Sequence, residues 1–217
     1  MQPVVHGLHA SSPALLPFDE AFEIRAFLLQ RPGGNLLLHG APGMGDEASA
    51  IEKLGGVARH YLGHWHEAMF AKAEFLVREE VPLLCHEDDR QQAEKHVRVT
   101  GTFAERHRPD PDFEAIPMPG HTRGSTAYLW HSGRHRCLFT ADSIYLRGDE
   151  WIAAVLRGSS DRETYLASLA MLSDLDFDVL VPWVASRGQP FYAMTDRQDA
   201  RRRIEAIIDR LRCGEDS

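Results

Sequence analysis

The sequence contains little cysteine. Its three cysteines, Cys85, Cys137 and Cys213, stand far apart, and none forms a C-x-x-C pair. An odd and sparse set excludes the disulfide framework of a small secreted domain and gives no thiolate zinc site. Cys85 and Cys137 lie in the apolar runs VPLLC and CLFTA, which predicts buried free thiols.

Long apolar runs and an excess of positive charge are also missing. No apolar run is as long as the about 18 residues that a membrane-spanning helix needs. Residues 1–13 (MQPVVHGLHASSP) lack the basic start and apolar stretch of a secretory signal. A formal net charge of −8 gives no electrostatic reason to bind nucleic acid or an anionic membrane. We therefore expect a cytoplasmic protein with a small-molecule partner, and the oligomeric state stays open.

The length and composition are those of an ordinary globular protein. A chain of 217 residues fits one domain, which we expect to span residues 1–217. Hydrophobic residues make up 43% and charged residues 26%, as is usual for such a domain. Histidine is the unusual residue, with 12 copies, and this excess suggests metal chemistry.

Hydrophobic patterning predicts strands followed by helices in each half of the chain. In the first half, apolar runs and turn residues predict a hairpin at 24–30 and 35–39, strands at 57–62 and 81–85, and helices at 46–54, 69–78 and 88–95. In the second half they predict strands at 113–118, 126–130, 137–140 and 179–181, and helices at 161–175 and 195–212. The arginine run 201–203 is expected on a solvated helix face. This order favours an α/β protein with two stacked sheets and helices outside.

Three short motifs carry histidine or aspartate where a predicted strand ends. His64 and His66 form an H-x-H pair, whose imidazoles would lie on one side of an extended chain. His121 stands in a Pro-Gly-His-Thr turn, and Asp142 closes the run CLFTAD. Each motif alone is equally typical of a surface loop, a turn or a cap. Their common position at strand ends indicates one site.

The order and spacing of these motifs resemble the metallo-β-lactamase superfamily, and most nearly its glyoxalase II-like hydrolases. The resemblance runs from about residue 25 to residue 183 and is most specific in MPGHTRGSTAYLW and LFTADSIY. It implies the four-layer αββα sandwich, with the metal cleft at one edge of the two sheets. It also implies that His64, His66, His121 and Asp142 are ligands of one metal ion, most simply zinc, with iron or manganese as alternatives.

The departures from the family pattern fall on its second ion. The family's H-x-H-x-D-H signature continues here with Glu67, and then has Ala68 and Met69 in place of its aspartate and last histidine. Val184 stands where the late turn has a histidine, and His39 where the early strand ends in aspartate. We therefore expect one ion, with Ala68, Met69 and Val184 grouped around the position of the missing one. Trp65 or Trp183 would lie beside them.

Without the signature's aspartate, another group must handle the proton of an attacking water. Glu67 and His39 are the candidate catalytic residues, although an extended loop would point Glu67 away from the ion. His39 could equally be a partner of a ligand, a filler of the second site, or a buried structural histidine. His86, in CHEDD, is expected to be structural or to support a ligand.

The resemblance leaves several functions open. The first is a mononuclear metal-dependent hydrolase of a small thioester, ester or lactone-like substrate. A variant is a mononuclear-iron oxygenase of the kind that acts on persulfides. The alternative is a catalytically reduced protein that binds a ligand or partner in the cleft. The four retained ligands favour an enzyme, whereas the alanine at position 68 favours a binding protein.

Overall fold

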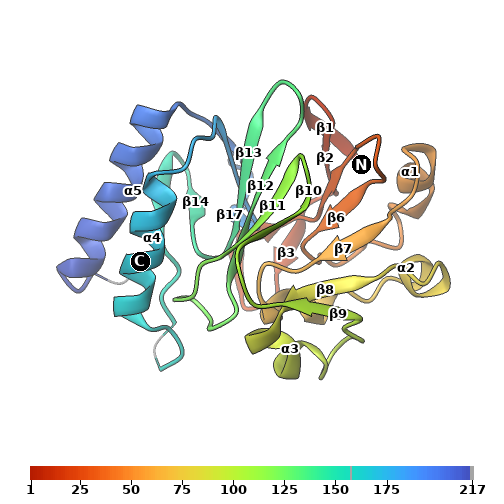
Figure 1. Ribbon diagram of the computed structural model, residues 1–217, viewed down its shortest axis with the longest axis horizontal. Helices are drawn as coiled ribbons and strands as arrows, with labels where there is room; N and C mark the ends of the chain where they lie inside the picture. The colour runs from red at the N-terminus through yellow and green to blue at the C-terminus, as the bar shows by residue number, and fades with distance from the viewer. Residues whose placement is uncertain (157, 216–217) are drawn as a thin grey trace.

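The computed structural model describes residues 1–156 and 158–215. Its centre is a pair of facing β-sheets, with helices on both outer faces (Figure 1). Within the described ranges, no helix has the length and apolar character that crossing a membrane requires.

The first sheet is built from the N-terminal half and has the strand order β1-β2-β5-β6-β7-β8-β9. β5 and β6 form the predicted antiparallel hairpin, whereas β6, β7, β8 and β9 run parallel. Their bounds are β1 Gln2–Val5, β2 Leu8–Ala10, β5 Phe27–Leu29, β6 Leu36–Leu38, β7 Arg59–Tyr61, β8 Leu83–His86 and β9 Gly101–Phe103. Parallel strands point their carboxyl ends to the same edge, and His64 follows β7 there.

The second sheet comes from the other half and has the order β10-β11-β12-β13-β16-β18. Its bounds are β10 His107–Asp110, β11 Phe113–Pro117, β12 Thr126–His131, β13 Arg136–Ala141, β16 Val179–Pro182 and β18 Ala193–Met194. β13 and β16 are its parallel pair. Asp142 follows β13 directly and Trp183 follows β16, so both reach the same end of the sheet.

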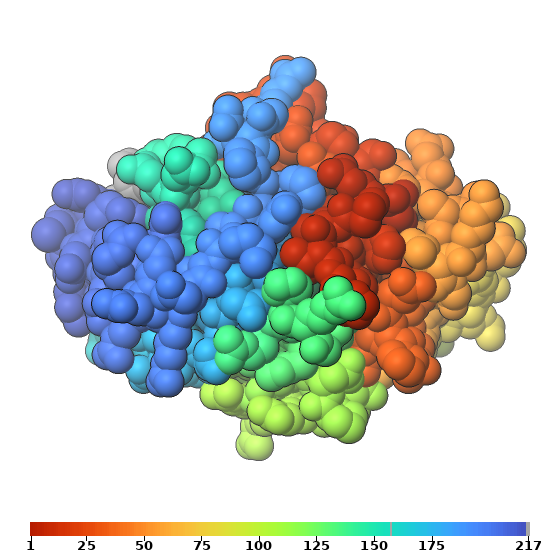
Figure 2. Space-filling model, turned by 90° about the horizontal axis from the view of Figure 1, so that it is seen from above, coloured from red at the N-terminus to blue at the C-terminus, as the bar shows by residue number. Residues whose placement is uncertain are grey.

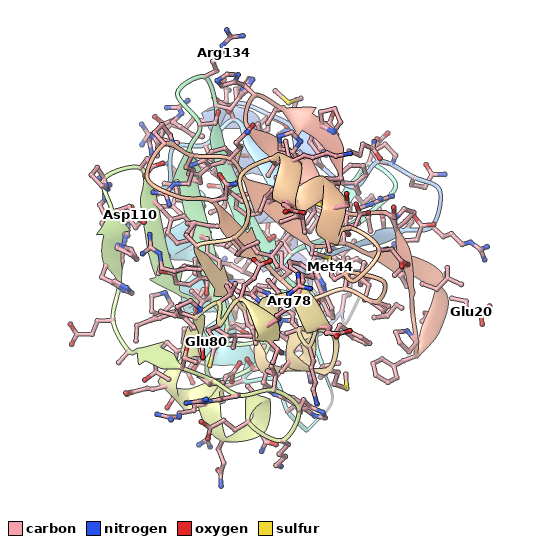
Figure 3. All side chains as sticks on the ribbon, turned by 90° about the vertical axis from the view of Figure 1, so that its right-hand side faces the viewer. Glu20, Met44, Arg78, Glu80, Asp110 and Arg134 are labelled. Carbon is pink, nitrogen blue, oxygen red and sulfur yellow. The ribbon has the colours of Figure 1, made fainter. Side chains whose placement is uncertain are left out.

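A smaller sheet joins segments that are far apart in the sequence. Its order is β15-β14-β17-β4-β3, with bounds β3 Ala14–Leu16, β4 Asp19–Ile24, β14 Tyr145–Arg147, β15 Glu150–Ile152 and β17 Val184–Ser186. β17 pairs with β4. In Figure 2 the blue and orange-red segments lie together in a part of the surface that protrudes at the top of the view. In Figure 3 the β3–β4 hairpin, which carries Glu20, stands away from the body of the molecule.

The helices complete a four-layer arrangement. α1 Ala48–Lys53 and α2 Glu74–Arg78 cover the first sheet together with α3 Glu87–Ala93, while α4 Arg162–Ser173 and α5 Arg197–Arg212 cover the second (Figure 1). Asp161 and Asp196 cap the last two helices by accepting backbone N–H bonds. The arrangement confirms the predicted αββα sandwich of the metallo-β-lactamase fold.

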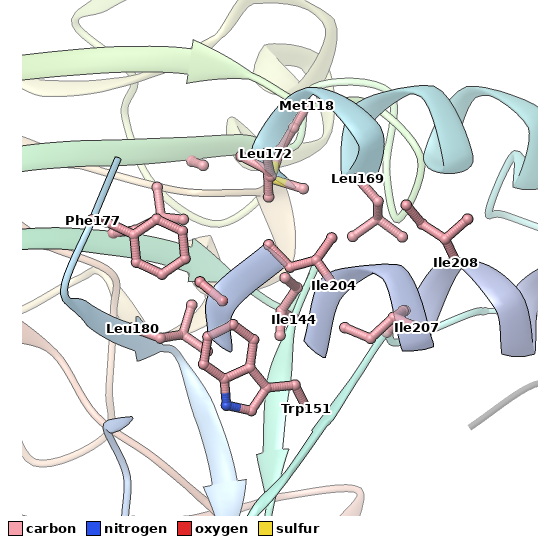
Figure 4. Close-up of a cluster of buried hydrophobic side chains, with 14 of the residues drawn as sticks. Met118, Ile144, Trp151, Leu169, Leu172, Phe177, Leu180, Ile204, Ile207 and Ile208 are labelled. Atoms are coloured by element: carbon pink, nitrogen blue, oxygen red, sulfur yellow. The ribbon is translucent and has the colours of Figure 1, made fainter. Parts of the chain in front are cut away.

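Two buried clusters hold the layers together. One fills the space between the two sheets and includes Phe27, Tyr128 and Trp130, none more than 1% exposed. The other joins α4 and α5 to the second sheet through Leu169, Ile204 and other side chains drawn in Figure 4. Burying aromatic and branched side chains on both faces of this sheet is the main source of its stability.

The cysteines behave as their neighbours predict. Cys85 and Cys137 are buried and unpaired, and burial raises the pKa of each thiol to about 12. Cys213 is exposed just after α5.

Two sequence predictions need correction. The helix expected over 69–78 is divided: a 3₁₀-helix spans Trp65–Phe70, and α2 begins only at Glu74. The short strands β1–β4, β9, β10, β14, β15, β17 and β18 were not predicted. The cause is visible in β4, whose six residues DEAFEI are mostly exposed or half-buried and so lack an apolar alternation.

Candidate metal centre

Four side chains from both halves of the molecule converge at the carboxyl ends of the sheets. His64, His66, His121 and Asp142 can each offer one ligand atom, and these atoms lie within 4.8 Å of one another. The motifs at three separate strand ends are thus brought together as a group that could hold one ion. That they bind a metal stays a prediction at this point.

His64 is fixed by Glu67. The imidazole Nδ1 lies 2.9 Å from Glu67 Oε1, and because an ionised carboxylate only accepts, Nδ1–H is the donor. The opposite nitrogen, Nε2, therefore faces the group and lies 3.3 Å from Asp142 Oδ2. A carboxylate behind a histidine is the usual way to fix the tautomer of a metal ligand.

His121 is fixed in the same way by a backbone carbonyl. Its Nδ1 donates to the oxygen of Ala154 over 2.8 Å, so Nε2 carries the free lone pair. This Nε2 lies 3.4 Å from His66 Nδ1 and 3.6 Å from Asp142 Oδ2. Three imidazole nitrogens and one carboxylate oxygen thus face a common point.

Two buried atoms of this group have no hydrogen-bond partner among the described residues, namely His64 Nε2 and Asp142 Oδ1. Buried polar atoms are almost always satisfied, so unpaired ones at a site call for an explanation. A divalent cation satisfies both, because it accepts lone pairs from imidazole and carboxylate together. The residues present therefore fit a zinc-type ion.

The pKa values of the three histidines differ because each has different charged neighbours. Burial lowers the pKa of His64, but the carboxylates of Asp142 and Glu67 override it and raise that pKa to about 10. Burial, followed by the neighbouring His64 and His121, lowers the pKa of His66 to about 3. Burial also lowers the pKa of His121. Two lone-pair imidazoles beside a carboxylate are the protonation state that a metal ion needs.

Glu67 does not point away from the site as an extended chain would require. Residues 65–70 turn into a 3₁₀-helix, and this turn brings the fully buried Glu67 carboxylate back over its own chain. Oε1 lies 3.0 Å from His39 Nδ1, and Oε2 accepts the backbone N–H of Gly63 over 3.0 Å. Burial raises the pKa of Glu67, but His39 and His64 outweigh it and lower that pKa to about 2.

His39 stands behind this carboxylate rather than at the ion position. Its backbone has φ 66°, which is unusual for a residue other than glycine. The ring is fully buried, packs against Phe27 and Phe139, and does not line the cavity described below. Its position is therefore that of a support for Glu67 and, through Glu67, for His64.

Asp89 was missed by sequence reasoning, yet it holds the loop that carries His121. Its Oδ2 accepts from Thr122 Oγ1 and from the backbone N–H of Trp65, each over 2.9 Å, and Oδ1 accepts from Gly124 over 3.0 Å. A side chain at Gly124 would meet the Asp89 carboxyl carbon at 2.5 Å, so glycine is required. His86 is structural, since its Nε2 donates to the Ala104 oxygen over 2.9 Å.

The expected group of Ala68, Met69 and Val184 does not form. Ala68 is fully buried in a cluster with Leu62 and Cys85, whereas Val184 packs with Tyr145 and Trp183. The 3₁₀-helix is the reason, because it turns Ala68 toward α3 and places Phe70 against Trp183, with ring centroids 6.1 Å apart.

An open cavity of about 340 Å³ leads to the group and is lined by His66, His121 and Asp142 at its inner end. Trp183 closes one side: its Nε1 donates to the Gly40 oxygen over 2.7 Å, and its ring lies edge-to-face with His64, 5.3 Å away. Trp65 lies against His66, with ring centroids 3.9 Å apart and the ring planes tilted by 56°. The site thus has aromatic flanks, as the sequence suggested.

The family model of the metallo-beta-lactamase superfamily matches residues 46–182, which is more than half of the chain. The chain therefore belongs to the metallo-β-lactamase superfamily. No curated protein sequence matches it.

Solved structures agree with this fold over nearly the whole length. The metallo-β-lactamase from Pontibacter korlensis is 15% identical, with a TM-score of 0.69 over 96% of this chain and 97% of that one. The mono-zinc form of the metallo-β-lactamase FIM-1 from Pseudomonas aeruginosa is 12% identical, with a TM-score of 0.72 over 96% and 93%. The di-iron form of TTHA1623 is 19% identical, with a TM-score of 0.66 over 89% and 98%. At these identities the likeness concerns the fold.

Proposed function

We propose that the protein is a mononuclear metal-dependent hydrolase of a small thioester, ester or lactone-like substrate. The observation that carries the proposal is the pair of buried unpartnered atoms, His64 Nε2 and Asp142 Oδ1, beside two further imidazoles at the inner end of an open cavity. Without a cation Asp142 Oδ1 has no hydrogen-bond partner among the described residues, and leaving such a buried acceptor unsatisfied costs about 1 to 3 kcal/mol.

Zinc suits three imidazoles and one carboxylate, and Fe(II) or Mn(II) are alternatives with the same ligand types. Such an ion supplies Lewis acidity, which polarises a carbonyl group and activates water near neutral pH. In the overall reaction the water oxygen bonds to the acyl carbon and the C–S or C–O bond breaks. The carboxylic acid then loses a proton, and the thiol or alcohol leaves protonated.

The chain's own residues set the geometry for this chemistry. Glu67 and the Ala154 carbonyl fix the ring orientations of His64 and His121, so both Nε2 atoms face the site before any ion arrives. His64 would release its Nε2 proton when an ion binds. Asp142, whose Oδ2 lies near both imidazoles, supplies the negative charge and a group that can accept a proton from water. Trp183 and Val184 shield one side from solvent.

A single ion is proposed because apolar residues replace the second set of ligands. Val184 lines the cavity next to Asp142, and Ala68 is buried elsewhere. Among the described residues, the four-residue group is the only cluster of three or more metal-ligating side chains. Carbon atoms cannot hold an ion, so the cavity wall offers space for substrate instead.

Metal analysis of protein purified without added metal tests the proposal, together with a screen for thioester and lactone hydrolysis. One ion per chain is expected, lost in His121→Ala and accompanied by loss of hydrolysis. Two ions per chain, or one ion that persists in His121→Ala, would contradict the assignment.

A metal-binding protein without turnover is the second candidate. It is favoured by the alanine at position 68 and by the placement of Glu67, whose carboxylate is fully buried behind His64 and away from the cavity. One firmly bound ion with no hydrolysis in the screen would select it. Oxygen consumption with a persulfide would select the iron-dependent oxygenase instead.

A further inference from the structure

The four residues His64, His66, His121 and Asp142 are called the metal group below. The smaller sheet forms one wall of the cavity beside them. Leu16 and Phe22 come from the β3–β4 hairpin, Tyr145 from β14 and Val184 from β17, and Trp183 joins them. All these side chains face the space in front of His66, His121 and Asp142. Anything that places a reacting carbonyl at the metal group must therefore lay the rest of its structure along this apolar wall.

We propose that the substrate carries an uncharged, apolar acyl chain of medium length, which lies between the β3–β4 hairpin and residues 154–156. The inference rests on the proposed hydrolytic function and specifies its substrate class. A volume of about 340 Å³ is at the small end of ligand cavities, and so suits a chain rather than a large ring system.

Exposed apolar side chains mark the mouth of this cavity. Phe18, in the turn of the hairpin, is 74% exposed, and Leu156 opposite is 37% exposed. Half-buried Phe22 and Val155 also line this cavity. Single exposed apolar residues are ordinary, but several gathered at the rim of a cavity indicate a binding surface. An acyl chain entering here would cover Phe18 and Leu156 while its carbonyl reaches the imidazoles.

The charges of the wall oppose an anionic substrate. Among the described residues that line the cavity, the acidic side chains are Asp19 at the hairpin and Asp142 at the metal group, and none is lysine or arginine. With its carbonyl at the metal group, a substrate would hold a terminal carboxylate near the mouth, where the acidic side chain lining the cavity is Asp19 and no lysine or arginine can pair with it. A neutral chain suffers neither penalty, so the cavity discriminates by charge as well as by length.

Binding is tested with two matched probes, octanamide and 7-sulfonatoheptanamide, which have the same chain length and differ in a terminal sulfonate, an anion that binds metal ions only weakly. Titration of the metal-loaded protein, followed by tryptophan fluorescence, is expected to give at least about tenfold tighter binding of octanamide. Phe18→Ala should weaken octanamide binding, and Phe18→Lys should shift the preference toward the sulfonate probe. Met194→Ala, which removes a 55% exposed side chain on β18, is the control and should change nothing.

Catalysis is tested with acyl thioesters of the neutral thiol N-acetylcysteamine, from acetyl to octanoyl. The value of kcat/KM should rise about fourfold for each added methylene until the cavity is filled. Phe18→Ala should flatten this dependence, whereas the control Met194→Ala should leave it unchanged. Thioesters of anionic thiols or with carboxylate-ended acyl chains should react more slowly.

The two tests separate this inference from the function on which it rests. Selective octanamide binding without hydrolysis of any thioester would overturn the hydrolase and retain the apolar chain site. Hydrolysis with equal affinity for both probes, or with no dependence on chain length, would overturn the chain site and retain the hydrolase.

Discussion

Glu67 shows how one buried side chain can set the properties of a metal ligand. Its carboxylate accepts from His64 and His39 and from the backbone of Gly63, so it is saturated and immobile. A group held in this way cannot shuttle protons to the cavity. Its effect is to keep the Nδ1 proton of His64 in place and Nε2 free.

Removing this carboxylate should weaken metal binding. For Glu67→Ala we expect zinc affinity to fall by about 10- to 100-fold, the usual effect of losing a partner of a metal-ligating histidine. Glu67→Gln should lose less, because its amide oxygen can still accept from His64. Competition with a chromophoric chelator measures both variants. Equal affinities for the natural chain and Glu67→Ala would show that His64 needs no such support.

Ala68 offers a contrast within the same turn. Because it is fully buried among apolar side chains, Ala68→Asp should lower the free energy of unfolding by at least about 2 kcal/mol. It should recruit no second ion. Met69→His, at a half-buried neighbouring position, is the matched control and should change stability little. Denaturant unfolding and metal analysis check both, and a stable Ala68→Asp holding two ions would contradict the packing described.

The grouping of His64, His66, His121 and Asp142 could be predicted from the sequence because each follows a strand whose apolar run ends abruptly. Glu67, Asp89 and the Ala154 carbonyl could not. Their roles depend on where a 3₁₀-helix turns and on which loop passes within 3 Å, and these are contacts between distant segments. The repeat of apolar residues along the sequence predicts helices and strands, but it does not predict contacts of this kind.

At the scale of elements, the two central sheets are tied at a pair of turns. Arg31, between β5 and β6, donates from Nε and from an Nη atom to the Asp112 carboxylate over 2.8 and 2.6 Å. Trp130 Nε1 donates to the same carboxylate over 3.2 Å. Asp112 lies in the β10–β11 turn, so this contact joins the first sheet to the second. The Arg31 side chain is only 3% exposed.

Asp112→Asn should therefore lower the free energy of unfolding by about 1 to 2 kcal/mol at pH 7, a value discounted for the 34% exposure of the Asp112 side chain. Arg31 lowers the pKa of Asp112 below its ordinary value. The stabilisation is therefore complete above about pH 4 and lost as the pH falls through the lowered pKa.

Guanidinium unfolding of both chains between pH 3 and pH 7 measures this difference. The control is Glu205→Gln, which breaks an exposed pair with Arg201 on α5 and should cost less than about 0.5 kcal/mol at any pH. A difference for Asp112→Asn that persists unchanged at pH 3 would contradict the ion pair as its cause.

Elements with a buried face were predictable, and those without one were not. α5 repeats isoleucine and leucine at helical spacing, and its predicted and observed ranges agree within two residues at the N-terminal end. β5 and β6 are fully buried apolar runs joined by turn residues. The β3–β4 hairpin is half-exposed. Its strand β4 pairs with β17, which lies at least 160 residues further along the sequence. Such pairing is decided by the assembled fold.

At the scale of the whole molecule, the metal group is shared between two halves. His64 and His66 follow the first sheet, whereas His121 and Asp142 belong to the second. An ion that binds all four residues is bound only by the folded chain, so binding adds directly to the stability of the fold.

Zinc at 100 times its dissociation constant should therefore stabilise the protein by about 2.7 kcal/mol and raise Tm by about 5 to 10 °C. His121→Ala should remove most of this shift. Calorimetry with zinc and with a chelator measures it, and His131→Ala, an exposed histidine at the end of β12, is the control. The same Tm with and without metal would show that the four residues do not form a shared site.

The buried contact between His39 and Glu67 also constrains how this sequence can have evolved. The Glu67 carboxylate lies 3.0 Å from the His39 imidazole. Both side chains are fully buried, so neither can turn into solvent. An ancestor with aspartate at position 39 and glutamate at position 67 would have buried two negative charges side by side. We therefore expect positions 39 and 67 to change together, or through a neutral intermediate. Relatives with aspartate at the position of His39 are expected to lack glutamate at that of Glu67, and covariation across an alignment checks this.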